Sequence, residues 1–198
     1  MFKIPTLSVA LTAAVLTATA TTWAAQDNQS RFLEVTVEEV AEKPLEAKLT
    51  GVEVAKPDEV AQGVVRIGDK IAFEIGGVKD SFIYIMNMDE QGTLRLIYPN
   101  RFAPEAEQSE KDVLIPAKED KYKFQVSGEP GKEVVKVIAI NGKNGVFETL
   151  LTELFEKDAA FPKAIVPTDD ATDKLEEFFS TSKLGDVRET SLEYTVLK

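Results

Sequence analysis

The feature that most constrains the fold is a series of short apolar and β-branched runs between residues 63 and 140, separated by turns rich in Gly and Pro. In residues 71–75 the large apolar side chains alternate with Ala72 and Glu74, whereas the run at residues 82–88 is apolar on both faces. Alternation indicates a strand with one buried face, and a continuous apolar run indicates a central strand. Many short strands between turns favour two packed sheets. We therefore predict a mainly β fold, an antiparallel β-sandwich of immunoglobulin-like or similar type.

The same patterns predict the individual elements. Residues 56–59 break one strand and residues 101–111 form a polar loop, whereas apolar residues from position 146 recur at helical spacing. Asp173 and Glu176 resemble a capping box that opens a short second helix. We therefore expect one or two C-terminal helices within residues 146–180, the first of which covers a sheet face or, alternatively, docks to a partner. The predicted strands are residues 31–40, 48–55, 64–67, 71–75, 82–88, 93–98, 113–115, 122–126, 133–140 and 192–196.

The N-terminal segment has the pattern of a secretory signal. Lys3 precedes an apolar stretch over residues 7–20, and small residues follow at positions 22–25. This stretch is shorter than the roughly 20 apolar residues that span a bilayer. We predict a signal peptide over residues 1–24 and a single β-rich domain over residues 25–198. No Cys follows the apolar stretch, so no lipid anchor is expected, and the mature protein is predicted to be periplasmic or secreted.

Composition excludes several classes of function. The net charge of −11 argues against nucleic acid and against an anionic membrane surface, because both need clustered Lys and Arg. No second apolar run approaches membrane length, so no membrane insertion is expected after cleavage. The chain has no His and no Cys, which excludes Ser-His-Asp triads, Cys nucleophiles and imidazole or thiolate metal sites. We therefore predict no catalytic residues, no metal and no cofactor.

Residues 63–141 carry an ordered set of motifs. A Gly68-Asp69 pair precedes a strand, and an aromatic strand follows at residues 82–85. Residues 92–100 form a hairpin that ends in Pro-Asn, and Ile115-Pro116 and residues 128–133 complete the order. This set resembles the exported bacterial domain-of-unknown-function family 4384. It departs from the family in having Phe82 where Tyr is usual and a longer acidic loop after the hairpin. The resemblance implies a small β-sandwich-like domain in a cell-envelope protein and implies no activity.

The most distinctive candidate binding run is Tyr98-Pro99-Asn100-Arg101-Phe102. In one interpretation the end of a strand presents Tyr98, Arg101 and Phe102 to a partner, while Asn100 fixes the loop through an Asx-type hydrogen bond. In the other, Tyr98 and Phe102 pack in the core and the Pro-Asn pair forms a corner.

Two acidic groups are further candidate sites. Asp169, Asp170 and Asp173 fail the calcium-loop spacing, because positions 3 and 6 from Asp169 are Ala171 and Lys174. Acidic residues at a helix N-terminus account for them.

The second acidic group consists of Glu105, Glu107, Glu110 and Asp112, which could provide the carboxyl pair of a glycoside hydrolase. The only Trp is Trp23, within the signal, so none remains in the mature chain to stack on a sugar. A solvated loop is the favoured interpretation.

The sequence therefore predicts an exported binding or accessory module of the bacterial envelope, without enzymatic activity. Its expected partner is an envelope protein, contacted through a strand edge or through the loop at residues 98–112. The alternatives are a carboxylate-based hydrolase of envelope glycans and a periplasmic domain that binds a small ligand or Ca²⁺.

Overall fold

The computed structural model describes residues 43–106, 108–109, 111–157, 159–182 and 187–198. All of these residues lie in one compact unit that spans residues 40–198. The predicted signal peptide and the predicted strand over residues 31–40 lie outside the described residues. The fold below is therefore that of the β-rich domain alone.

Two sheets form the domain. Sheet A has the order β1-β3-β7, with β8 also paired to β3, and all its pairs are antiparallel. Sheet B has the order β2-β10-β9-β4-β5, with β6 paired to the start of β4. The strands of sheet A are β1 (Glu46–Glu53), β3 (Lys70–Gly76), β7 (Val113–Ile115) and β8 (Phe124–Gln125). The strands of sheet B are β2 (Val64–Arg66), β4 (Ser81–Met88), β5 (Leu94–Tyr98), β6 (Gln108–Ser109), β9 (Gly131–Asn141) and β10 (Val187–Leu197).

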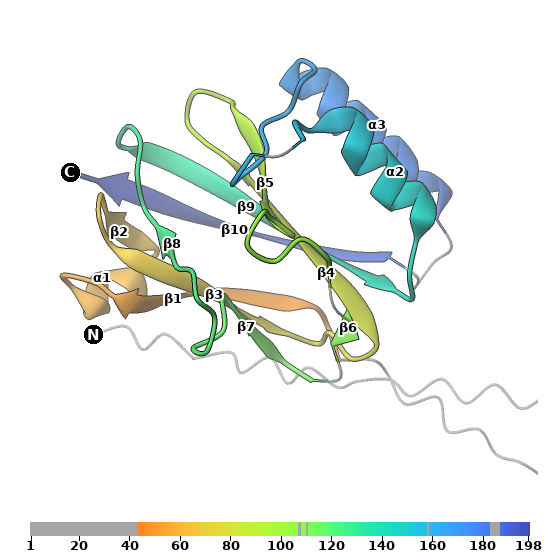
Figure 1. The fold of residues 1–198 in the computed structure, drawn as a ribbon. Helices are drawn as coiled ribbons and strands as arrows, with labels where there is room; N and C mark the ends of the chain where they lie inside the picture. Colours follow the sequence, from red (N-terminus) through yellow and green to blue (C-terminus); the bar gives the residue numbers. More distant parts are fainter. Residues whose placement is uncertain (1–42, 107, 110, 158, 183–186) are drawn as a thin grey trace, which may run out of the picture. The chain divides into compact units, whose positions relative to one another are not determined.

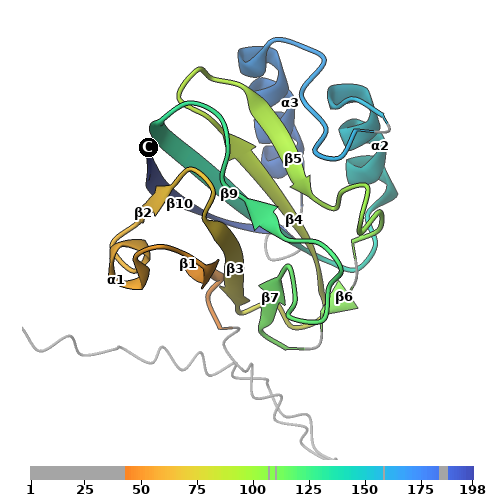
Figure 2. The same ribbon diagram turned by 60° about the vertical axis from the view of Figure 1, so that its left-hand side comes forward.

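Sheet B is the middle of three layers, between sheet A and the two long helices (Figures 1 and 2). Side chains of β4 and β9 alternate between two cores. Ile85 and Val137 pack towards sheet A, whereas Tyr84 and Ile138 pack towards the helices. Because both faces of these strands are buried in their central parts, apolar residues occupy successive positions there, as at residues 82–86 and 137–140. The predicted β-sandwich with C-terminal helices is confirmed, with one parallel pair, β2 with β10, in an otherwise antiparallel arrangement.

Helix α2 (Gly145–Leu154) covers the outer face of sheet B, as one of the two interpretations of residues 146–155 predicted. Asn144 caps it, because its Oδ1 accepts a hydrogen bond of 3.0 Å from the backbone N–H of Phe147. Phe147, Leu151 and Leu154 recur at helical spacing and are buried against the sheet. The side-chain cap fixes the start of the helix, and the single apolar face explains why the sequence pattern predicts it.

Helix α3 (Thr168–Thr181) begins five residues before the predicted capping box, so the prediction that Asp173 opens it is wrong. Its N-cap is Pro167, which makes no side-chain capping bond. The Thr168 hydroxyl donates instead to the carbonyl of Gly92 at 2.6 Å, which fixes the first turn to a distant hairpin. Asp169 and Asp170 lie in that first turn, where the helix dipole favours them.

Three short elements differ from the prediction in type or in length. Helix α1 (Pro57–Val60) occupies the segment read as a break, and β6 lies within the segment predicted as a loop. Strand β8 has two residues where five were expected. Elements this short carry too few residues for a periodic pattern. Among the described residues, no helix is long and apolar enough to cross a membrane.

The packing of α2 on sheet B gives a stability prediction. Phe147 is fully buried, and its ring centroid lies 4.8 Å from those of both Tyr84 and Phe178. We expect Phe147→Ala to lower the free energy of unfolding by about 3–5 kcal/mol, because it opens a cavity between helix and sheet. The neighbouring Val146 is 72% exposed, so Val146→Ala is the matched control. Urea denaturation followed by circular dichroism compares the two, and equal losses would contradict this account of the packing.

Candidate functional site

A cavity of about 650 Å³ opens between the inner faces of the two sheets. Sheet A contributes β3, β8 and the turn after β8, and sheet B contributes β4, β5, β9 and β10. The connection between α2 and α3 supplies a further side through Glu156, residues 159–161 and Lys163. Elements from most of the chain therefore meet at this site.

Three of the polar side chains that line the cavity are joined by hydrogen bonds, and we call them the polar floor: Asn87 of β4, Glu133 of β9 and Tyr194 of β10. Glu133 and Tyr194 are directly paired across the strands. The Asn87 amide and the Tyr194 hydroxyl each donate to Oε2 of Glu133 at 2.7 Å. Asn87 and Tyr194 are buried and Glu133 is half-buried. The floor is thus a carboxylate held by two neutral donors.

The electrostatics of the floor fix its protonation pattern. Burial raises the pKa of the Tyr194 hydroxyl, and the neighbouring Glu133 carboxylate raises it further. The hydroxyl therefore stays protonated and remains a donor to Glu133. Within the described residues, Glu133 forms no ion pair and its Oε1 accepts no hydrogen bond. One carboxylate oxygen is consequently available to a molecule in the cavity.

An ion pair lies beside the floor. Arg95 donates to Oδ2 of Asp89 at 2.6 Å, and both side chains are largely buried. Oδ1 of Asp89 accepts from the backbone N–H groups of Gln91 and Thr93, which fixes the turn between β4 and β5. Burial by itself would raise the pKa of Asp89, but the hydrogen bonds from Arg95 and Thr93 outweigh burial and hold this pKa below its usual value. The positive charge of Arg95 is therefore already neutralised by Asp89.

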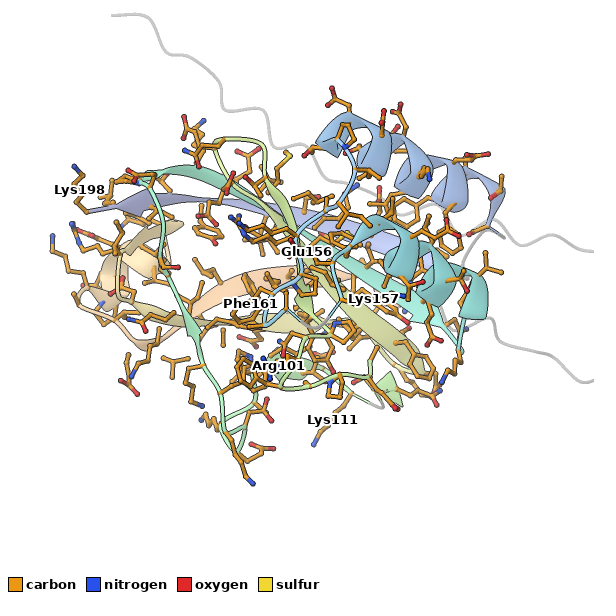
Figure 3. The ribbon with its side chains drawn as sticks, turned by 45° about the horizontal axis from the view of Figure 1, so that its top comes forward. Arg101, Lys111, Glu156, Lys157, Phe161 and Lys198 are labelled. Atoms are coloured by element: carbon orange, nitrogen blue, oxygen red, sulfur yellow. The ribbon has the colours of Figure 1, made fainter. Side chains whose placement is uncertain are left out.

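Opposite the polar groups stands an aromatic wall formed by Phe73, Phe124 and Phe161. The Phe124 centroid lies 6.0 Å from that of Phe73 and 5.8 Å from that of Phe161, the latter pair edge-to-face. Ile71 and Ile97 add aliphatic surface. Figure 3 shows Phe161 and Glu156 on the connection between the helices, with Arg101 nearby. Polar and apolar surfaces thus share one cavity, an arrangement typical of sites for small organic molecules.

The residues predicted from sequence lie next to this cavity and do not line it. Tyr98 is buried between the sheets, and Asn100 is 5% exposed. Asn100 makes the predicted Asx bond, because its Oδ1 accepts from the Phe102 N–H at 2.8 Å. Arg101 is exposed and Phe102 is 58% exposed, with its ring stacked on Tyr122. A partner at this surface would therefore touch Arg101 and Phe102 and would not reach the ring of Tyr98.

Among the described residues, the members of the two candidate acidic groups do not come together in a site. Asp112 pairs with Lys43 at 2.7 Å and accepts from the backbone N–H of Gly77. Glu107 and Glu110 lie outside the described residues. In the part of the chain that the structure describes, no three acidic side chains are grouped so that they could hold a metal ion.

Sequence reasoning missed the polar floor. Asn87 lies in the strand predicted to be apolar on both faces. Glu133 was noted only as part of the family motif and as the start of a strand, and Tyr194 only as part of an alternating strand. The sequence feature that could have revealed the polar floor is a polar residue at an inner-face position of an otherwise apolar strand. Such a residue is costly to bury without a role, so it marks a position worth testing.

Comparison with known proteins supports the resemblance stated above. Residues 64–141 match the model of a family described as a domain of unknown function (DUF4384), as predicted. This span includes β2 to β9, and hence Asn87 and Glu133. It ends before α2, α3 and β10, so Tyr194 lies outside it. No curated protein and no solved structure matched the chain.

The ion pair at the cavity predicts a dependence of stability on pH. The pKa of Asp89 is lower in the folded protein than the value of about 3.9 in an unfolded chain. Its contribution to stability is therefore complete above the unfolded value and is lost as the pH falls through the folded value. We expect Asp89→Asn to cost about 1–3 kcal/mol of unfolding free energy at pH 7, and markedly less at pH 3.

Urea denaturation at the two pH values measures this difference. Asp173→Asn is the control, because Asp173 is exposed on α3 and its side chain makes no hydrogen bond or ion pair within the described residues. A cost for Asp89→Asn that is the same at both pH values would show that the ion pair does not stabilise the fold.

Proposed function

We propose that this protein is an exported, non-catalytic binding module of the bacterial cell envelope, and that the cavity between its sheets binds a small organic molecule. The secretory pattern of residues 1–24 supports the location, and the resemblance described for residues 63–141 implies the same. The lack of His and Cys supports binding over catalysis, since these are the commonest general bases and thiol nucleophiles.

The observation that carries this proposal is a half-buried carboxylate facing an aromatic wall inside one open cavity. Among the residues that the structure describes, Glu133 has no cationic partner, and partly burying it between two sheets costs free energy that an apolar residue would not cost. The apolar core around Ile85 and Val137 reaches this cavity through Phe73 and Phe124, so the carboxylate lies where the core borders the cavity. A volume of about 650 Å³ lies within the range of about 300–1,000 Å³ typical of ligand sites.

Thermal unfolding in the presence of small molecules tests the proposal. The full chain is expressed with its N-terminal segment, and the mature protein is recovered from the periplasmic fraction. It is then melted against a panel of amines, carboxylates, sugars and aromatic metabolites. We expect at least one compound that combines an apolar body with a polar group to raise Tm, because a ligand of the folded state stabilises it.

Two variants make this test specific. Phe161→Ala removes part of the aromatic wall and should abolish the shift, whereas Val146→Ala on the exposed side of α2 should retain it. Each shift is measured from the Tm of the same variant without ligand. A panel without any shift, or a shift that survives Phe161→Ala, would refute binding in this cavity.

A second candidate function is contact with an envelope protein through the loop at residues 98–112. The observation that favours it is Phe102, a large apolar side chain that is 58% exposed on a turn fixed by Asn100. Exposed aromatic residues on rigid turns are typical anchors of protein interfaces.

Site-specific crosslinking in cells tests this candidate. Phe102 is replaced by p-benzoylphenylalanine, and Val146, which is exposed on α2, is replaced in the same way as a control. We expect a discrete crosslinked species from position 102 alone. Identical patterns from both positions would count against a partner at this loop.

A further inference from the structure

We infer that the ligand of the cavity is an organic cation, an ammonium attached to an apolar or aromatic body, and that the ammonium binds Glu133 of the polar floor. This inference rests on the proposed function, because it names the class of molecule that the same cavity takes. It is carried by the distribution of charge and of aromatic surface around that carboxylate.

The first step of the argument is the unbalanced charge of the floor. Asn87 and Tyr194 satisfy Oε2 of Glu133 by hydrogen bonding, but both are neutral and leave its negative charge in place. Within the described residues, no Lys or Arg lies within ion-pair distance of this carboxylate. An ammonium can donate to the available Oε1 and also neutralise the charge. A charge-assisted bond of this kind is stronger than a bond between neutral groups.

The second step concerns the cations that line the cavity. Arg95 is paired with Asp89, and Lys163 is exposed at the rim together with the carboxylates Glu129 and Glu156. The charge of the lining is therefore negative overall, like that of the whole chain at −11. An anionic ligand would face repulsion from Glu133 in a partly desolvated site, where such interactions are strong.

The third step is the aromatic wall opposite the floor. Phe124 and Phe161 line the same cavity as Glu133, and the face of an aromatic ring attracts a cation within about 6 Å of its centroid. The aliphatic side chains of Ile71 and Ile97 extend this surface for the body of the ligand. Carboxylate, aromatic rings and aliphatic surface together match an amphiphilic amine better than a sugar, which needs several polar groups.

Isothermal titration with three probes that share one carbon skeleton tests the inference. The probes are 4-phenylbutylammonium, 4-phenylbutanol and 4-phenylbutyrate, which are cationic, neutral and anionic. We expect the affinity to be highest for the ammonium and lowest for the carboxylate, with a difference of about tenfold or more between those two. The mature protein is used in each titration at low ionic strength, because salt screens exposed charges.

Glu133→Gln removes the negative charge and keeps an oxygen that can accept from Asn87 and Tyr194, so the fold should be retained. We expect this variant to bind the ammonium about tenfold more weakly, while its affinity for the alcohol stays unchanged. Glu193→Gln is the matched control. Glu193 precedes Tyr194 in β10, is exposed, and lies on the other face of the strand. This control should bind all three probes as the wild type does.

The outcomes separate this inference from the proposed function. Equal binding of the alcohol and the ammonium, tighter binding of the carboxylate, or an unchanged affinity in Glu133→Gln would overturn the assignment of a cation, while the cavity would remain a binding site. Absence of binding by all three probes also overturns it. The proposed function falls only if the broad thermal panel gives no shift that depends on Phe161.

Discussion

The structure depends on the burial of sheet B on both faces. Strands β4 and β9 place apolar side chains towards sheet A and towards the helices, so neither face can remain in water. Sheet A covers one face, and α2 with α3 covers the other (Figure 1). Strand β10, from the far end of the chain, lies between β2 and β9 and completes the sheet. The span matched by the family model lacks this strand, which shows how far the domain extends beyond it.

The candidate site follows from the way the two sheets end. Near the ends of β4 and β10 and the start of β9, the apolar inner face gives way to Asn87, Glu133 and Tyr194. The connection between the helices also reaches this region, because residues 162–164 pair with β5 and bring Phe161 beside Phe124. The polar floor and the aromatic wall thus lie at the same end of the sandwich, where the strand ends and the connection between the helices meet. A cavity lined by both polar and apolar side chains is the physical basis for proposing a small-molecule site and an organic cation as its ligand.

The sequence predicted correctly those elements that have a long periodic or apolar pattern, or that end at a recognisable turn signal. The apolar run at residues 82–88, the return strand that ends at Tyr98 and the face of α2 all agree with the structure. The start of α3 was placed wrongly because Asp173 and Glu176 imitate a capping box inside the helix. The true start depends on Thr168 bonding to Gly92, a contact between residues far apart in sequence. The loop around Asn100 was predicted in its local bonding, which needs only neighbouring residues.

The sequence by itself determined the β-rich class, most strand positions and the absence of His and Cys chemistry, because these follow from composition and local periodicity. Only the tertiary structure decided where the cavity lies and which residues face it. Asn87 and Glu133 are 46 positions apart, and Glu133 and Tyr194 are 61 apart. Their meeting depends on strand order and register, which are set by non-local pairing and by the burial of both faces of sheet B.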